Sequence, residues 1–259
     1  MSGLYPSQTV VVCASTKRRA EAEALARALD LACVAELPAP PDWIALVLDD
    51  ERLSLQLTGP GAPGPVSAEF VSGRGGWRAR EAKARGETLS RAAGVGRAGA
   101  TEVIDATAGL GRDGFLLAAG GCRVTLVERH PAVVAVLRDG LARAAAASAT
   151  AESAARVTLV EADAREFLSR GSADVVLVDP MHPPRRKSAA VRKEMRLFRA
   201  LVGRDDDAAE LLNAALSAAR RRVVVKRPAG APSLAGRPPS GAIEERSTRF
   251  DIYAGLADR

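Results

Sequence analysis

Four apolar segments of the sequence each end in a carboxylate that could take part in ligand binding. Asp105 ends TEVID, Glu128 ends CRVTLVE, Asp163 ends RVTLVEAD and Asp179 ends ADVVLVD. The segments alternate with helical patterns, which is typical of parallel strands in a doubly wound sheet. Ligands of such sheets bind outside the carboxyl ends of the strands. We therefore expect the four carboxylates at one edge of one sheet.

A glycine-containing turn, ATAGLGRDG, follows the first segment. Gly109 and Gly111 let the backbone approach a ligand closely, and the helix that follows presents its N–H groups. The spacing departs from the G-x-G-x-x-G fingerprint, so the turn predicts either a nucleotide-like ligand or only a change of direction. Glu128 comes 23 residues after Asp105 and could accept both hydroxyls of a ribose. The alternative is a solvated carboxylate.

Asp163 stands between the third strand and the helical segment AREFLS. Its carboxylate could accept a hydrogen bond from an adenine amine. It could equally cap the N-terminus of the helix. Both roles are compatible with one carboxylate, so both stay open.

The fourth segment carries the most specific chemistry, because Asp179 opens the sequence D-P-M-H. An exocyclic base amine is a poor nucleophile, since its lone pair is delocalised into the ring. A carboxylate oxygen and a rigid backbone carbonyl can accept its two N–H groups and localise that lone pair toward a methyl sulfonium. Pro180 stiffens the backbone, and the planar side chain of His182 would stack on the base. D-P-M-H resembles the (N/D)-P-P-(Y/F) motif of amino-group methyltransferases; the alternative is an Asp that caps a turn beside an exposed His.

A cationic run follows this motif, with seven Arg or Lys and one Glu between Arg185 and Arg199. Such a run is often only a solvated helix face. Beside a base pocket it predicts a track for the phosphates of a nucleic acid, to which Arg74, Arg78 and Arg80 could add. The candidates for RNA binding are Arg185, Arg186, Lys187, Arg192 and Lys193.

The chain divides into two expected domains. Residues 1–72 contain the strand TVVVCAS, a helix over 17–31 and two strands around the turn at 49–51, which predicts a small α/β accessory domain. Residues 73–259 predict a Rossmann-like, doubly wound and mainly parallel sheet. Within it, STRFDIYAG is expected as a late edge strand, and the Pro-rich span over 229–242 as a surface loop.

The composition points to a nucleic-acid partner. The 259 residues carry a net charge of +6 and a pI near 9.7, which favours a polyanion, although a merely soluble basic protein has the same balance. Three cysteines match no metal motif, so we expect reduced thiols in a cytoplasmic protein and no metal. No apolar run is long enough to span a membrane, and the N-terminus lacks the charge order of a secretory signal.

The four strand-end motifs in this order resemble a class I, S-adenosylmethionine-dependent methyltransferase. DATAGLGRDGF, VERHP, VDPMHP, KSAAVRKEMRLFRALVG, VVVKRP and RFDIYAG together resemble the RsmJ family, the small-subunit (16S) ribosomal RNA guanine-N2 methyltransferases. The resemblance covers about residues 73–255 and is specific, because the long run after the DPM sequence is not general to methyltransferases. The first 70 residues carry little of it.

The resemblance implies the cofactor S-adenosylmethionine, the product S-adenosylhomocysteine and 16S ribosomal RNA or the small subunit as partner. It assigns Asp179, Pro180 and His182 to the catalytic motif. The family has Phe where this chain has His182, so base affinity is expected to depend on pH near neutrality. The residues that it places at the cofactor are Asp105, Gly109, Gly111, Arg112, Asp113, Glu128, Arg129, Asp163, Ala164 and Asp179.

Three other functions remain as alternatives. One is a different base-amine methyltransferase, acting on adenine N6 or cytosine N4. Another is a ribosome-assembly protein that binds RNA without catalysis. An NAD-dependent oxidoreductase would share the sheet, but D-P-M-H and the cationic run after it have no role there.

Overall fold

The computed structural model describes residues 8–72, 87–95, 101–180, 197, 200–201 and 207–256. These residues form two compact units, and each is described by itself. The first unit contains residues 8–68, 130–140, 197 and 200–201, and the second contains the remaining described residues. In the part of the chain so described, no helix is both long and apolar enough to cross a membrane. The domain boundary expected after residue 72 borders residues outside the described ranges, and it stays a prediction.

The first unit is built on a four-stranded sheet in the order β2-β1-β3-β4. β1 pairs in parallel with β2 and β3, and β4 closes the sheet antiparallel to β3. The short β2 was not expected from the sequence, because its ACV stretch lies at an edge and is mostly exposed. The elements are β1 (Thr9–Cys13), η1 (Thr16–Arg18), α1 (Arg19–Leu29), β2 (Ala32–Val34), β3 (Ile44–Leu48) and β4 (Leu53–Leu57).

The second unit holds a seven-stranded sheet in the order β10-β11-β9-β8-β5-β6-β7. The five strands from β7 to β9 run parallel, and β11 is antiparallel to both of its neighbours. This confirms the doubly wound, mainly parallel fold. The strands are β5 (Glu102–Asp105), β6 (Arg123–Glu128), β7 (Val157–Glu161), β8 (Ala173–Val178), β9 (Ala219–Pro228), β10 (Gly241–Glu244) and β11 (Thr248–Ala254).

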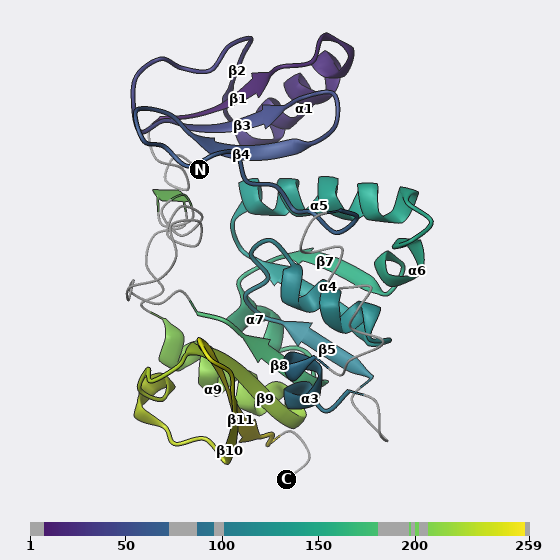
Figure 1. Cartoon of the computed structure of the whole chain (residues 1–259), viewed down its shortest axis with the longest axis vertical. Helices are drawn as coiled ribbons and strands as arrows, with labels where there is room; N and C mark the ends of the chain where they lie inside the picture. Colours follow the sequence, from purple (N-terminus) through teal and green to yellow (C-terminus); the bar gives the residue numbers. More distant parts are fainter. Residues whose placement is uncertain are drawn as a thin grey trace. The chain divides into compact units, whose positions relative to one another are not determined.

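Helices cover both faces of this sheet, and they can be followed in Figure 1. α7 and α9 bury their apolar side chains against one face, where Val176 and Val223 are fully buried. α4 packs on the other face so closely that a Cβ on Gly114 would lie 2.3 Å from Leu126 Cδ2. The helices are α3 (Thr88–Ala93), α4 (Arg112–Ala119), α5 (Pro131–Ala146), α6 (Ala151–Ala154), α7 (Ala164–Leu168), α9 (Ala208–Ala218) and the turn η2 (Leu234–Gly236); the first ten residues of α5 belong to the first unit.

One expectation about the sheet was wrong. The segment STRFDIYAG forms β11, but it lies between β9 and β10 and is not an edge strand. The edge is β10, which begins at Gly241, inside the span expected to be a loop. The sequence pattern does not predict β10, because its four residues are mostly exposed and do not alternate between apolar and polar.

Candidate active site

Four strand-end carboxylates lie at the carboxyl edge of the seven-stranded sheet. Two of them end their strands: Glu128 ends β6 and Asp105 ends β5. The other two come just after theirs: Asp163 follows β7 and Asp179 follows β8. The four strands are neighbours in the order β7, β6, β5 and β8. The chain proceeds from β5 outward to β6 and β7, and then returns to the other side of β5 with β8 and β9. The sheet order therefore reverses between β5 and β8, at the position where ligands of open α/β sheets bind.

The turn between β5 and α4 is shaped by its glycines. Gly109 has φ +52° and Gly111, the N-cap of α4, has φ +70°, a left-handed conformation that glycine adopts readily. The N–H of Gly109 donates to Glu128 Oε2 at 3.0 Å. The end of β6 thus fixes the turn, and Arg112 and Asp113 follow in the first turn of α4.

Asp105 is the buried carboxylate of the site, with 2% of its surface exposed. Its Oδ1 accepts the N–H of Thr107 at 3.2 Å. Burial, and secondarily the negative charge of Asp113, raises the pKa of Asp105 to about 7. Near neutral pH this group therefore exists both protonated and ionised.

Asp179 follows β8 and is held from two directions. Its backbone N–H donates to Thr107 Oγ1 at 2.6 Å. Its Oδ2 lies 3.0 Å from Lys226 Nζ, and the same ammonium donates to Asp113 Oδ2. The next residue, Pro180, is buried. The candidate base-amine acceptor is therefore linked to the turn after β5 and to the start of α4.

Asp163 caps α7, which confirms one of the two roles considered for it. Its Oδ1 accepts the N–H of Arg165 at 2.8 Å, and its Oδ2 accepts Arg165 Nη2 at 2.7 Å. The hydrogen bonds from Arg165 lower the pKa of Asp163. Ala164 is the first residue of the helix. Arg129, expected at the cofactor, forms an ion pair with Asp207 at 2.9 Å.

Lys226 and Thr107 belong to the candidate site, although no sequence motif assigns either of them a role. Lys226 lies within VVVKRP and Thr107 within the glycine turn. The available signal was a cation directly after the apolar run Val223–Val225. The remaining candidates, His182, Arg185, Arg186, Lys187, Arg192 and Lys193, lie outside the described residues.

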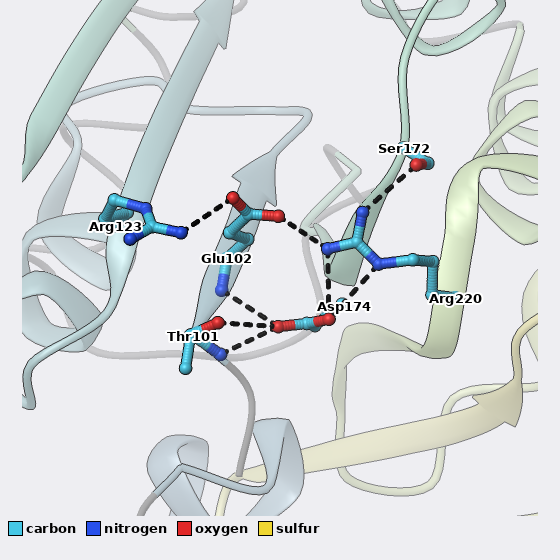
Figure 2. Close-up of polar contacts among 6 residues, drawn as sticks. All are labelled: Thr101, Glu102, Arg123, Ser172, Asp174 and Arg220. Atoms are coloured by element: carbon cyan, nitrogen blue, oxygen red, sulfur yellow. Dashed lines mark hydrogen bonds and ion pairs between the residues drawn. The ribbon is translucent and has the colours of Figure 1, made fainter.

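A separate ion-pair network, drawn in Figure 2, lies at the amino ends of β5, β8 and β9. Arg220 Nη2 lies 2.5 Å from Glu102 Oε2 and 3.0 Å from Asp174 Oδ1. The N–H groups of Thr101 and Glu102 also donate to Asp174. Burial raises the pKa of Asp174, but these hydrogen bonds outweigh burial and lower it to about 2. The network ties β5, β8 and β9 together at the edge opposite the candidate site.

The doubly wound sheet, the glycine turn after β5 and Asp179-Pro180 at the reversal of strand order define a class I methyltransferase. The family model of SAM-dependent methyltransferases matches residues 28–255. The chain belongs to this family, and within it to the ribosomal RNA small subunit methyltransferase J proteins. It is accordingly an enzyme whose methyl donor is S-adenosylmethionine.

Individual relatives are similar along most of the chain. It is 51% identical over 244 residues to ribosomal RNA small subunit methyltransferase J of Thioalkalivibrio sulfidiphilus, with 93% of this chain and 95% of the relative covered. The protein of the same name from Marinobacter nauticus is 50% identical over 214 residues, with 81% and 77% covered. A crystal structure of a SAM-dependent methyltransferase from Neisseria gonorrhoeae has 35% identity and a TM-score of 0.73, with 95% of each chain covered.

The charges of the site fit this cofactor. Among the described residues, the carboxylates of Asp113 and Asp179 contact the ammonium of Lys226, and Asp105 interacts with all three charges. S-adenosylmethionine carries a sulfonium cation, which nearby carboxylates attract. Of the atoms that the structure describes, a Cβ on Gly109 would meet only Thr107 O, at 3.9 Å, which allows close approach to the backbone.

Proposed function

We propose that this enzyme methylates the exocyclic N2 of a guanosine in 16S ribosomal RNA and releases S-adenosylhomocysteine. The observation that carries the proposal is Asp179-Pro180 at the end of β8, beside the glycine turn. The names of the relatives support ribosomal RNA of the small subunit as substrate. The choice of guanine N2 follows from the family resemblance of the sequence.

The cofactor would lie along the carboxyl edge of β5 and β6. S-adenosylmethionine supplies an electrophilic methyl group on a sulfonium. Glu128 would accept hydrogen bonds from the ribose hydroxyls, and the turn at Gly109 and Gly111 would give the cofactor access to backbone N–H groups. The remaining candidates fall into two groups. The charged end of the cofactor would lie near Asp105, Arg112 and Asp113. Its ribose and adenine would lie near Arg129, Asp163 and Ala164.

Asp179 would act on the base amine. Its carboxylate would accept an amine N–H while the lone pair of the nitrogen points toward the methyl group. After the carbon–sulfur bond breaks and the nitrogen–carbon bond forms, the nitrogen would lose this proton through Asp179, and Pro180 would keep the following backbone rigid. Catalysis then consists mostly of positioning, since the sulfonium is already electrophilic. The guanine must leave its stack to reach this residue, and stacking on His182 would hold it there.

The RNA would be bound by the cations that follow the motif, which include Arg185, Arg186, Lys187, Arg192 and Lys193. Their proximity in sequence to Asp179 and the net charge of +6 support this assignment. A substrate in the small ribosomal subunit implies a cytoplasmic enzyme. Residues 1–72 would form an accessory domain beside the methyltransferase domain over 73–259.

Transfer of a tritiated methyl group from S-adenosylmethionine tests the proposal. The substrates are small subunits and naked ribosomal RNA from cells that lack this protein, and Asp179→Ala is the control. Label in N2-methylguanosine that is lost in the variant is the expected result. Label in N6-methyladenine or N4-methylcytosine would replace guanine with another base amine. RNA binding without label, unaffected by Asp179→Ala, would contradict an enzymatic role on RNA.

A further inference from the structure

Lys226 lies at the carboxyl end of β9, directly after the buried residues Val223, Val224 and Val225. Its ammonium contacts Asp113 Oδ2 and lies 3.0 Å from Asp179 Oδ2. Lys226 therefore links Asp113, in the helix that follows the glycine turn, to Asp179, the proposed amine acceptor. The side chain is 29% exposed, so the ammonium has only limited access to water.

The sheet register explains this position. Val178 of β8 pairs with Val225 of β9, so the next residues, Asp179 and Lys226, lie side by side. Their side chains point to the face that α4 covers, since alternate residues of a strand share a face and Leu177 pairs with Val224. Asp113 reaches the same ammonium from the first turn of α4.

Several charged groups lie around Lys226. Asp105 from β5, Asp113 from α4 and Asp179 are within electrostatic reach of one another. Arg227, the next residue of β9, also interacts with the charge of Asp179. Burial lowers the pKa of Lys226, but Asp179 and Asp113 outweigh this and raise it above its usual value. Without the ammonium, repulsion between the three carboxylates would favour protonation.

We propose that Lys226 is a positioning residue for methyl transfer, which holds Asp179 ionised and in fixed orientation relative to the start of α4. The inference rests on the proposed function, because it gives Asp179 the role of amine acceptor. It adds a residue to the site that the strand-end motifs do not include. Lys226 acts through Asp179 and Asp113, so it affects the reaction without contributing a group to it.

The first experiment compares Lys226→Met and Lys226→Arg with the wild type in methyl-transfer rate between pH 5.5 and 9. We expect kcat of Lys226→Met to fall roughly 100-fold at pH 7 and its acid limb to move to higher pH, with partial recovery in Lys226→Arg. KM for S-adenosylmethionine should change less than kcat. Lys17→Met, at an exposed lysine of the first unit, is the matched control. An unchanged profile in an active Lys226→Met enzyme overturns the inference and leaves the proposed function standing.

The second experiment needs no RNA substrate. Carboxyl-¹³C aspartate labelling follows the ionisation of Asp179 by NMR, and Asp179→Asn assigns its resonance. The midpoint should lie at higher pH in Lys226→Met than in the wild type. Equal midpoints overturn the inference whatever the RNA assay shows. If the midpoints differ while the wild type methylates no ribosomal RNA, the proposed function fails and the effect of Lys226 on Asp179 stands.

Discussion

Thr107 Oγ1 accepts the backbone N–H of Asp179 at 2.6 Å, and this contact crosses the position where the sheet reverses its strand order. Thr107 belongs to the turn after β5, whereas Asp179 follows β8. The same turn donates the N–H of Gly109 to Glu128 at the end of β6. Three strand ends are thus connected through one turn, so the proposed cofactor side and the proposed substrate side of the site are positioned together.

The first prediction concerns Asp179→Asn. The variant keeps the shape of the side chain but loses the negative charge, so kcat should fall about 10²–10³-fold. Binding of S-adenosylhomocysteine should weaken far less than kcat falls, because Asn keeps the shape and the hydrogen-bonding oxygen of the side chain; calorimetry can measure this. Asp30→Asn is a suitable control, because Asp30 is exposed and its left-handed backbone suits Asn. Retained activity in Asp179→Asn would exclude the carboxylate as the acceptor.

The second prediction concerns Glu128, which should bind the ribose while fixing Gly109. Glu128→Ala removes a charged hydrogen-bond acceptor, so affinity for S-adenosylhomocysteine should fall roughly 10–100-fold. Glu128→Gln retains an oxygen that can accept the Gly109 N–H, and it should lose less. Titration calorimetry of both variants tests this without RNA. Equal affinities for the wild type and Glu128→Ala would remove Glu128 from the cofactor site.

The third prediction is a pH dependence of stability that originates at Asp105. Its pKa is about 7 in the folded chain against 3.8 for the ordinary group, so the folded chain keeps a proton that the unfolded chain releases. Stability from this group is therefore present below pH 4 and lost as pH rises toward 7, by at most about 4 kcal/mol for about three pKa units.

Asp105→Asn cannot titrate, so it should gain stability relative to the wild type as pH rises from 4.5 to 8. Urea unfolding at several pH values measures the difference. A constant difference across this range would show that Asp105 does not carry the raised pKa.

The fourth prediction separates stability from catalysis at the network in Figure 2. The pKa of Asp174 is about 2 against the usual 3.8, and its side chain is 17% exposed. Asp174→Asn should therefore cost about 1–2 kcal/mol at pH 7, after allowance for solvent screening. The cost should shrink as pH falls from about 4 to about 2, because the unfolded wild-type chain then takes up a proton at Asp174 that the folded chain does not.

The same variant should keep its methyl-transfer rate below its melting temperature, since Asp174 lies at the amino ends of the strands. Thermal unfolding and the tritium assay measure the two effects separately. A large fall in kcat of the folded variant would contradict the assignment of this edge to stability.

The fifth prediction concerns His182, where the family resemblance of the sequence leads us to expect Phe. Imidazole stacks with less area than phenyl and gains a charge below its pKa, so KM for RNA should vary between pH 6 and 8. The ratio of wild type to His182→Phe isolates this effect, because Asp105 titrates in both proteins. A ratio that is constant over this pH range would show that His182 does not set base affinity.

The sequence by itself determined the components of the candidate site. The apolar runs fixed β5, β6, β7 and β8, and their terminal carboxylates followed from local pattern alone. The glycine turn was equally local, because Gly109 and Gly111 supply backbone conformations that other residues adopt at a cost.

The tertiary structure alone decided which residues meet. Lys226 lies 47 positions after Asp179 in the chain, and only the pairing of β8 with β9 and its register bring them side by side. Local periodicity likewise did not predict that β11 pairs with both β9 and β10. Periodicity reports which face of an element is buried, whereas the neighbours of a strand depend on contacts between distant segments, which no short stretch encodes.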